Sequence, residues 1–265
     1  MKNQVQKCKF VEHIEIWAIV ISLLLLGMSS LFSWDDNPVM GLDKICADSI
    51  IVLVCIFVIR QMGLWNTAGF QKKGFGRGML YGIPFLVIGL GSVIVSNVGV
   101  DFAQIEFVSL KNALLFTANM LLVGMNEEIW MRAFVLNGLL YKYGMGQKGI
   151  RKAIIVSALI FGAIHIPNLF FMYPVTVLVQ VVNAASAGAL FGAMFIKSKN
   201  IWAGIIIHAM VDWCSLFIGN CFTGAATVLS MEMTLVQGGC IILLGSLPPI
   251  LITCLLLRKT AEADN

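Results

Sequence analysis

The chain has 265 residues, of which 59% are hydrophobic and only 12% charged, and its mean hydropathy is +0.90. A soluble domain carries about 25% charged residues, so this composition excludes an ordinary soluble protein. The net charge is +4, but we find no phosphate loop or nucleic-acid module and expect no nucleic-acid partner. The seven cysteines are scattered without a CxxC pair, which argues against a thiolate metal site or a disulfide framework.

The apolar residues form long runs without strand-like alternation, which favours helices over an outer-membrane barrel. We therefore predict an all-α, polytopic transmembrane bundle of about eight spans, forming a single integral membrane domain over residues 1–265. The second span has the shortest apolar centre, because Asp48 and Arg60 lie in it, and the fourth is too long for one simple crossing. The predicted segments are 16–32, 45–65, 79–100, 110–143, 150–166, 174–196, 201–218 and 235–257.

The charged loops of these segments are asymmetric. One set of alternating loops, together with both termini, carries nearly all the basic residues: Lys2, Lys7, Lys9, Lys72, Lys73, Arg77, Lys142, Lys148, Arg151, Lys152, Lys197, Lys199, Arg258 and Lys259. The other set holds only Lys44 and Lys111 beside six acids. Basic loops stay in the cytoplasm, so we predict a multi-pass protein of the cell (inner or plasma) membrane with both termini cytoplasmic.

A few titratable groups remain inside the predicted spans. A charge at the centre of a span costs about 2.5–3.5 kcal/mol on insertion scales, so such groups indicate a functional site in the bundle interior. They lie on three spans and are Glu127, Glu128, Arg132, His165, His208 and Asp212.

Their spacing predicts how the acids of the fourth span are used. Glu128 and Arg132 are i,i+4 and share a helix face, where they can pair. Glu127 is rotated by about 100° from Glu128, so the two carboxylates point to different neighbours. One acid can therefore be structural while the other faces a cavity.

The two later spans repeat the i,i+4 spacing. Phe161 precedes His165 by four residues, so its ring can flank the imidazole, and His208 precedes Asp212 by four, so both can line one wall. On the sixth span, Gln180 and Asn183 lie near small residues that suit close helix packing, and we expect these amides to make interhelical hydrogen bonds.

This set of groups supports three chemistries, which spacing alone does not separate. A carboxylate and an imidazole can activate water while a second imidazole holds an oxyanion. Glu127, His165 and His208 could instead bind zinc. A Glu–His–Asp chain could also relay protons in a transporter. The usual HExxH zinc motif and the GxSxG serine motif are both absent from the sequence.

Three motifs resemble those of the CPBP family of CAAX proteases and bacteriocin-processing enzymes, which includes CAAX prenyl endopeptidases and abortive-infection-like proteins. "EEIWMR" matches EExxxR, "FGAIH" matches FxxxH and "HAMVD" matches HxxxN/D, in that order on three membrane segments. The resemblance covers the residues 110–218, which we take as the catalytic core.

The resemblance implies an intramembrane endopeptidase of the glutamate type that needs no cofactor, with zinc as the alternative. Glu127 and His165 would activate the water, His208 and Asp212 would stabilise the oxyanion, and Glu128, Arg132 and Phe161 would support the site. The prenyl-processing branch usually has Asn at the last position, so Asp212 puts the oxyanion role in doubt and favours a metal or the orientation of His208.

The expected partners are the lipid bilayer and a membrane-bound peptide or protein substrate. The bacterial-type charge pattern favours leader-peptide processing or bacteriocin self-immunity over a prenylated substrate. The rivals are a proton-coupled transporter and a catalytically idle immunity protein. A transporter would show matching broken helices in two halves, and only the "SLPP" segment at 246–249 predicts an interruption, in the last span.

Overall fold

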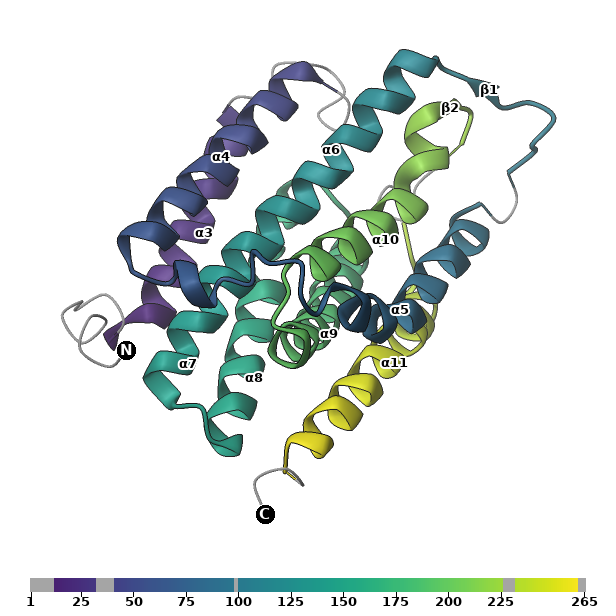
Figure 1. The fold of residues 1–265 in the computed structure, drawn as a ribbon. Coiled ribbons are helices and arrows are strands. Elements are labelled where there is room, and N and C mark those ends of the chain that lie inside the picture. The colour runs from purple at the N-terminus through teal and green to yellow at the C-terminus, as the bar shows by residue number, and fades with distance from the viewer. Residues whose placement is uncertain (1–11, 32–40, 98–99, 226–231, 262–265) are drawn as a thin grey trace.

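A computed structural model describes residues 12–31, 41–97, 100–225 and 232–261. Helices dominate these residues and follow one another in an antiparallel bundle (Figure 1). The N-terminal half contributes α3 (Ile14–Leu31), α4 (Leu42–Gln61), the short 3₁₀ turn η1 (Trp65–Thr67) and α5 (Phe75–Ser96). The all-α bundle predicted from the sequence is confirmed.

The fourth predicted segment, 110–143, is one continuous helical segment in three parts. These are α6 (Leu110–Glu128), a π-helical stretch η2 (Ile129–Leu136) and α7 (Asn137–Tyr143). Ser109 caps its start, because its side chain accepts a hydrogen bond from the backbone N–H of Asn112. Gly144 ends it with a φ of 89°, a conformation that glycine adopts without strain. The π stretch begins directly after the paired glutamates, and such irregular turns are frequent at functional sites.

The C-terminal half contributes α8 (Gln147–Ala163), the 3₁₀ turn η3 (Ile166–Phe170), α9 (Pro174–Ser198), α10 (Trp202–Cys221) and α11 (Leu235–Ala261). A two-residue strand β1 (Glu106–Phe107) pairs antiparallel with β2 (Phe222–Thr223) and ties the loop before α6 to the end of α10. The predicted break at "SLPP" is wrong, since α11 runs through Pro248 and Pro249. Membrane helices tolerate proline because neighbouring groups satisfy the freed carbonyls.

Each of the eight predicted segments is helical, and five helices of the described residues are long and apolar enough to cross a membrane. These five are Phe75–Ile94, Gln147–Phe170, Pro174–Ser198, Trp202–Cys221 and Leu235–Arg258. The helices α4 and α6 are not among these five because both carry charged groups.

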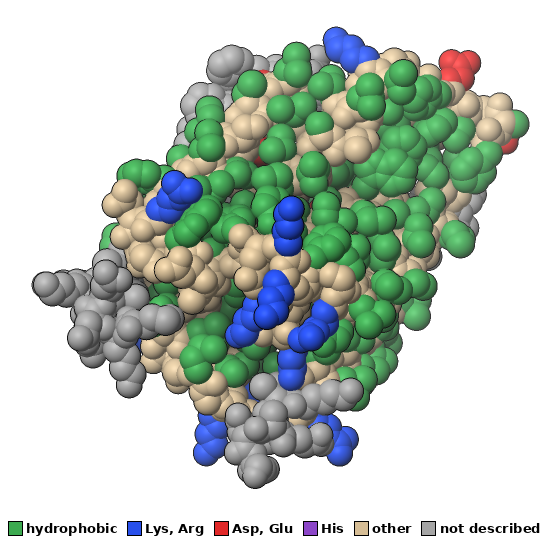
Figure 2. All heavy atoms as spheres, in the orientation of Figure 1, with side chains coloured by type: hydrophobic (Ala, Val, Ile, Leu, Met, Phe, Trp, Pro, Cys, Tyr) green, Lys and Arg blue, Asp and Glu red, His purple; other side chains and the backbone are tan. Residues whose placement is uncertain are grey.

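Large apolar side chains cover the face of the molecule seen in Figure 2, as expected for a surface in contact with lipid. On α5, Leu80, Val87 and Ile94 recur at seven-residue intervals and are 65%, 61% and 73% exposed. Most of the visible Lys and Arg side chains lie in the middle and lower part of this face, with one at its top edge and one at the upper left, whereas the visible acidic ones lie at the upper right. The asymmetry agrees with the charge pattern of the loops.

The helices that carry the predicted site pack closely against one another. Gly124 of α6 is needed for this approach, because a Cβ there would lie 2.9 Å from the carbonyl oxygen of Ile205 on α10. Between α8 and α9, a Cβ at Gly188 would lie 3.0 Å from the ring of Phe161. These small residues bring α6, α8, α9 and α10 together at one level of the bundle.

Candidate active site

The core of the site is a buried carboxylate that joins two charged groups from different helices. Oε1 of Glu128 lies 2.8 Å from Nδ1 of His208, and Oε2 of Glu128 lies 3.0 Å from Nε of Arg132. The side chains of Glu128 and Arg132 are each 1% exposed. A carboxylate only accepts hydrogen bonds, so Nδ1 of His208 carries a proton and donates a hydrogen bond to Glu128.

Gly204 makes this contact possible, since a Cβ at that position of α10 would lie 3.2 Å from Oε2 of Glu128. The predicted i,i+4 pairing of Glu128 with Arg132 is present, and the structural use of one acid stays a prediction. The contact between Glu128 and His208 is not visible in the sequence, because it joins residues eighty positions apart.

The other nitrogen of the imidazole faces two further acids. Nε2 of His208 lies 3.6 Å from Oε2 of Glu127 and 3.4 Å from Oδ2 of Asp212. The side chains of Glu127 and Asp212 are 30% and 31% exposed, so both reach an accessible space, whereas His208 is 10% exposed. One imidazole thus separates a buried structural acid from two accessible acids.

Aromatic rings enclose the charged groups. The ring of Phe191, on α9, stacks on His208 with centroids 5.2 Å apart and an interplanar angle of 16°. The guanidinium carbon of Arg132 lies 4.9 Å from the ring centroid of Phe161 and 5.3 Å from that of Phe191. Cations are attracted to ring faces, so the two phenylalanines stabilise a buried positive charge that has few hydrogen-bond partners.

His165 lies directly after α8, at the rim of this group. Its Nδ1 is 2.9 Å from the carbonyl oxygen of Phe161, and its ring meets the Phe161 ring edge-on at 5.4 Å. The predicted flanking of His165 by Phe161 is therefore confirmed. His165 is also close enough to Asp212 for their charges to interact.

The structure thus places the six predicted groups at one level of the bundle, from α6, η2, the residue that precedes η3, and α10. It also adds a residue that the sequence analysis missed: Phe191 was read only as part of an apolar run. A second omission is Asp48 of α4, which is 1% exposed and accepts a hydrogen bond from Asn126, the neighbour of Glu127. Asp48 was seen only as a charge that weakened a span.

The amides of α9 have the structural role predicted for them. Gln180 accepts a hydrogen bond from Asn168 at 2.7 Å, and Asn183 accepts one from Ser246 of α11 at 2.6 Å. Both bonds join α9 to a neighbouring element, so the prediction of interhelical hydrogen bonding is confirmed.

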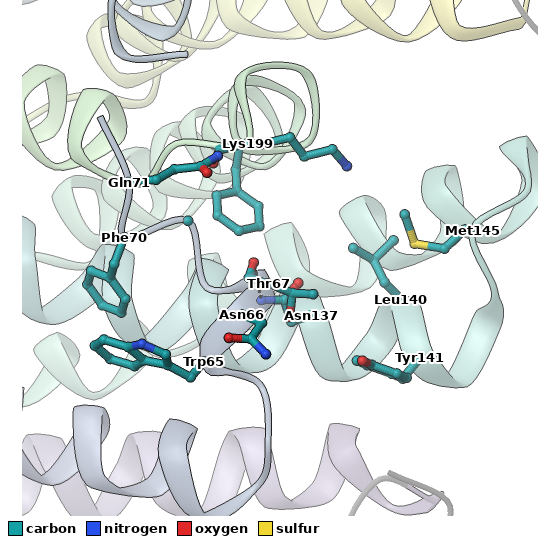
Figure 3. Close-up of a pocket in the computed structure, with 12 residues that line it drawn as sticks. Trp65, Asn66, Thr67, Phe70, Gln71, Asn137, Leu140, Tyr141, Met145 and Lys199 are labelled. Atoms are coloured by element: carbon teal, nitrogen blue, oxygen red, sulfur yellow. Dashed lines mark hydrogen bonds between the residues drawn. The ribbon is translucent and has the colours of Figure 1, made fainter. Parts of the chain in front are cut away.

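A cavity of about 620 Å³ lies away from these groups (Figure 3). It is lined by the η1 turn, by α7 and by the end of α9, including Trp65, Asn137 and Lys199, and by none of the six predicted groups. Size alone therefore does not identify the site of chemistry in this fold.

Zinc was the alternative for Glu127, His165 and His208. Within the described residues, no group of three His, Cys, Asp or Glu side chains is arranged to hold a metal ion. Nδ1 of His208 is already used by Glu128, and Nδ1 of His165 faces a carbonyl. These contacts leave Nε2 of each imidazole, and a metal-bound histidine usually holds a carboxylate or a carbonyl with its other nitrogen, so zinc and metal-free chemistry both stay predictions.

An acid- and imidazole-lined site inside a helical membrane bundle is compatible with a membrane-embedded enzyme that works by acid–base chemistry. Residues 109–214 match the family model described as type II CAAX prenyl endopeptidase Rce1-like. The match confirms the predicted resemblance of this segment to the CPBP family of CAAX proteases, and it supports a membrane protease, a hydrolase. No curated protein sequence matches the chain.

Proposed function

We propose that the protein is a glutamate-type intramembrane endopeptidase, in which Glu127 activates a water for attack on a peptide carbonyl. Glu127 takes a proton from the water as its oxygen bonds to the carbonyl carbon. The carbon–nitrogen bond then breaks, and the proton passes to the departing amine. The products are a new carboxyl terminus and a new amino terminus.

One observation carries this proposal: Glu127 is the accessible acid of the pair, and it faces Nε2 of an imidazole whose other nitrogen is fixed. With 3.6 Å between the two atoms, both groups can contact one small reacting group that lies to one side of them. A general base must lie within hydrogen-bond reach of the proton it takes, directly or through one water, and such contacts tighten when substrate binds.

We assign the oxyanion to His208. Its Nδ1–H is held by Glu128, and the carboxylates of Glu127 and Asp212 beside Nε2 favour a proton there as well. A doubly protonated imidazole presents Nε2–H to the accessible space, where it can stabilise the negative oxygen of the tetrahedral intermediate.

Asp212 then assists His208 through this same nitrogen. Glu128 contacts Nδ1 of the ring at 2.8 Å and Asp212 contacts Nε2 at 3.4 Å, so orientation of His208 by Asp212 stays a prediction. We propose that Asp212 helps keep Nε2 protonated. His165 stays in the proposal as the second group acting on the water beside Glu127, supported by its contact with Phe161, whose ring also lies against His208.

The proposed substrate is a membrane-associated peptide or protein, because the site lies inside a bundle whose surface suits lipid. The charge asymmetry of the loops supports cytoplasmic termini in a cell membrane. We propose leader-peptide processing or bacteriocin self-immunity as the biological role, supported by the bacterial-type charge pattern.

The experiment compares membrane peptides of cells that make the wild-type protein with those of cells that make Glu127→Gln. The proposal expects peptides that appear only with the wild type. A purified peptide of this set, in liposomes, should be cut by the wild type and by Glu106→Gln, an exposed-acid control on β1, but not by Glu127→Gln or His165→Ala. Cleavage that survives both of these substitutions would refute the protease mechanism.

A further inference from the structure

A second, smaller cavity lies on the other side of Glu127. It has a volume of about 100 Å³ and lies between α3, α4, α6 and the residue that follows α8. We call it the Asp48 cavity; its lining residues include Ser22, Lys44, Asp48, Asn126, Glu127 and Ile164. Glu127 is the only member of the six site groups among its lining residues.

A charged pair lines this cavity. Asp48 is 1% exposed and lies 2.9 and 2.7 Å, through its two oxygens, from Nζ of Lys44. A buried acid in an apolar helix has a cost in membrane insertion, and such residues usually mark an ion or water pathway. The side chain of Lys44, near the start of α4, is 20% exposed.

Asn126 connects the pair to the site. Its Nδ2 donates to Oδ1 of Asp48 at 3.3 Å, which fixes the amide so that its Oδ1 points the other way. That oxygen is buried and, among the described residues, accepts no hydrogen bond. A buried carbonyl without a donor is costly, and in a polar cavity the usual partner is a water molecule.

The cavity has room for such water. A single water needs about 10–15 Å³ of cavity volume, so a cavity of 100 Å³ holds several water molecules. The polar lining residues Asn126, Asp48 and Glu127 can serve as their hydrogen-bond partners. The other side of Glu127, which faces His208 and Asp212, is where the peptide carbonyl must sit under the proposed function. Water and substrate can therefore reach Glu127 from opposite sides.

We propose that the Asp48 cavity stores the hydrolytic water and delivers it to Glu127, with Asn126 as a positioning residue held by Asp48. This inference rests on the proposed function for the use of the water, but the presence of water in the cavity does not depend on activity. The proposal predicts that the Asp48 cavity contains water in the protein without substrate.

Hydroxyl-radical footprinting in liposomes reads bound water directly. Met131 and Met194 are equally buried, at 0% and 1% exposure, but only Met131 lines the cavity. Radicals formed from water in the cavity should oxidise Met131 at least several-fold faster than Met194. Equal rates for the two methionines would overturn the proposal, whatever the activity of the preparation.

Two substitutions test the use of this water. Asn126→Leu removes the polar oxygen, and Ile51→Phe adds bulk at the lining. Each substitution should slow the oxidation of Met131. Each should also lower kcat by about tenfold while KM changes less than twofold, because the positioning of water is lost and substrate binding is kept. Asn220→Leu makes the same chemical change on α10, where the amide only bonds its own helix, and should change neither readout.

The outcomes separate this inference from the protease assignment. If the cavity is dried by Asn126→Leu or Ile51→Phe and kcat is unchanged, the delivery role is wrong while the protease assignment stands. If Glu127→Gln still cleaves, the proposed function fails, and the oxidation rate of Met131 still reports whether the cavity is wet.

Discussion

Oε1 of Glu128 lies 2.8 Å from Nδ1 of His208, so an acid on α6 fixes the orientation of an imidazole on α10. The pair is buried, and Arg132 completes it from the next turn of the same helical segment. Glu128 therefore acts on the chemistry without facing the accessible space. Its neighbour Glu127 faces that space and shares the same histidine.

The first prediction concerns the stability of this buried group. Arg132→Met should lower the free energy of unfolding by about 3–5 kcal/mol, because it leaves the Glu128 carboxylate buried without its cation. The double variant Glu128→Met/Arg132→Met should recover most of that loss, since well-packed apolar residues can replace a buried ion pair. The double variant should nevertheless be inactive, because His208 has lost the group that orients it.

Lys142→Met is the matched control. Lys142 pairs with Glu15 at 2.6 Å, but their side chains are 31% and 27% exposed, and such pairs contribute about 0–1 kcal/mol. Reversible unfolding in detergent measures all three variants. An Arg132→Met protein as stable as Lys142→Met would show that the buried pair is not part of the folded core.

The second prediction concerns Phe191, which stacks on His208. Phe191→Leu keeps an apolar side chain but removes the ring face, and kcat/KM should fall by about tenfold as the imidazolium loses its cation–π contact. Phe85→Leu is the control, because Phe85 packs edge-on against Phe191 at 5.6 Å without touching His208. Similar losses of stability are expected from both, and equal losses of activity would contradict a role for the stack.

The sequence predicts the contacts of this site that form within one helix, but not the contacts that join different helices. The i,i+4 spacing of Glu128 with Arg132, and of Phe161 with His165, follows from helix geometry, and both contacts are present. Which turn of α10 meets Glu128 depends on the rotation and depth of two helices. The spacing of residues along one helix gives neither its rotation nor its depth relative to another helix, so the contact between Glu128 and His208 could not be predicted from the sequence.

Asp48 shows a second limit of the same kind. In the sequence it is an acid that shortens an apolar run, and only the packing of α4 against α6 brings it to Asn126. The break predicted at Pro248 and Pro249 failed for a related reason, because neighbouring helices and local adjustments decide whether a membrane helix tolerates proline.

The third prediction concerns the close approach of α6 and α10. Gly124→Ala places a Cβ about 3 Å from backbone atoms of Ile205 and Ala209, so the helices must separate. We expect a loss of about 1–3 kcal/mol in the free energy of unfolding, and a larger fractional loss of activity, since Glu128 and His208 move apart. Gly91→Ala on α5 meets nothing within 4 Å and should be neutral or slightly stabilising. Equal behaviour of the two variants would contradict the packing argument.

The fourth prediction concerns metal dependence. Cleavage by the purified protein should persist after treatment with 1,10-phenanthroline or EDTA, because Glu127 acts on water without a Lewis acid. Initial rates before and after treatment measure this. Activity that disappears and returns with added Zn²⁺ would instead support the zinc alternative for Glu127, His165 and His208.

The most direct test of the central claim is a double-mutant cycle on kcat/KM with Glu127→Gln and His208→Gln. Groups that act on one reacting centre are strongly non-additive. We predict that each single variant loses nearly all activity and that the double variant is no slower than the slower single one. Losses that multiply in the double variant, or a single variant that keeps wild-type activity, would show that these two side chains do not form one catalytic unit.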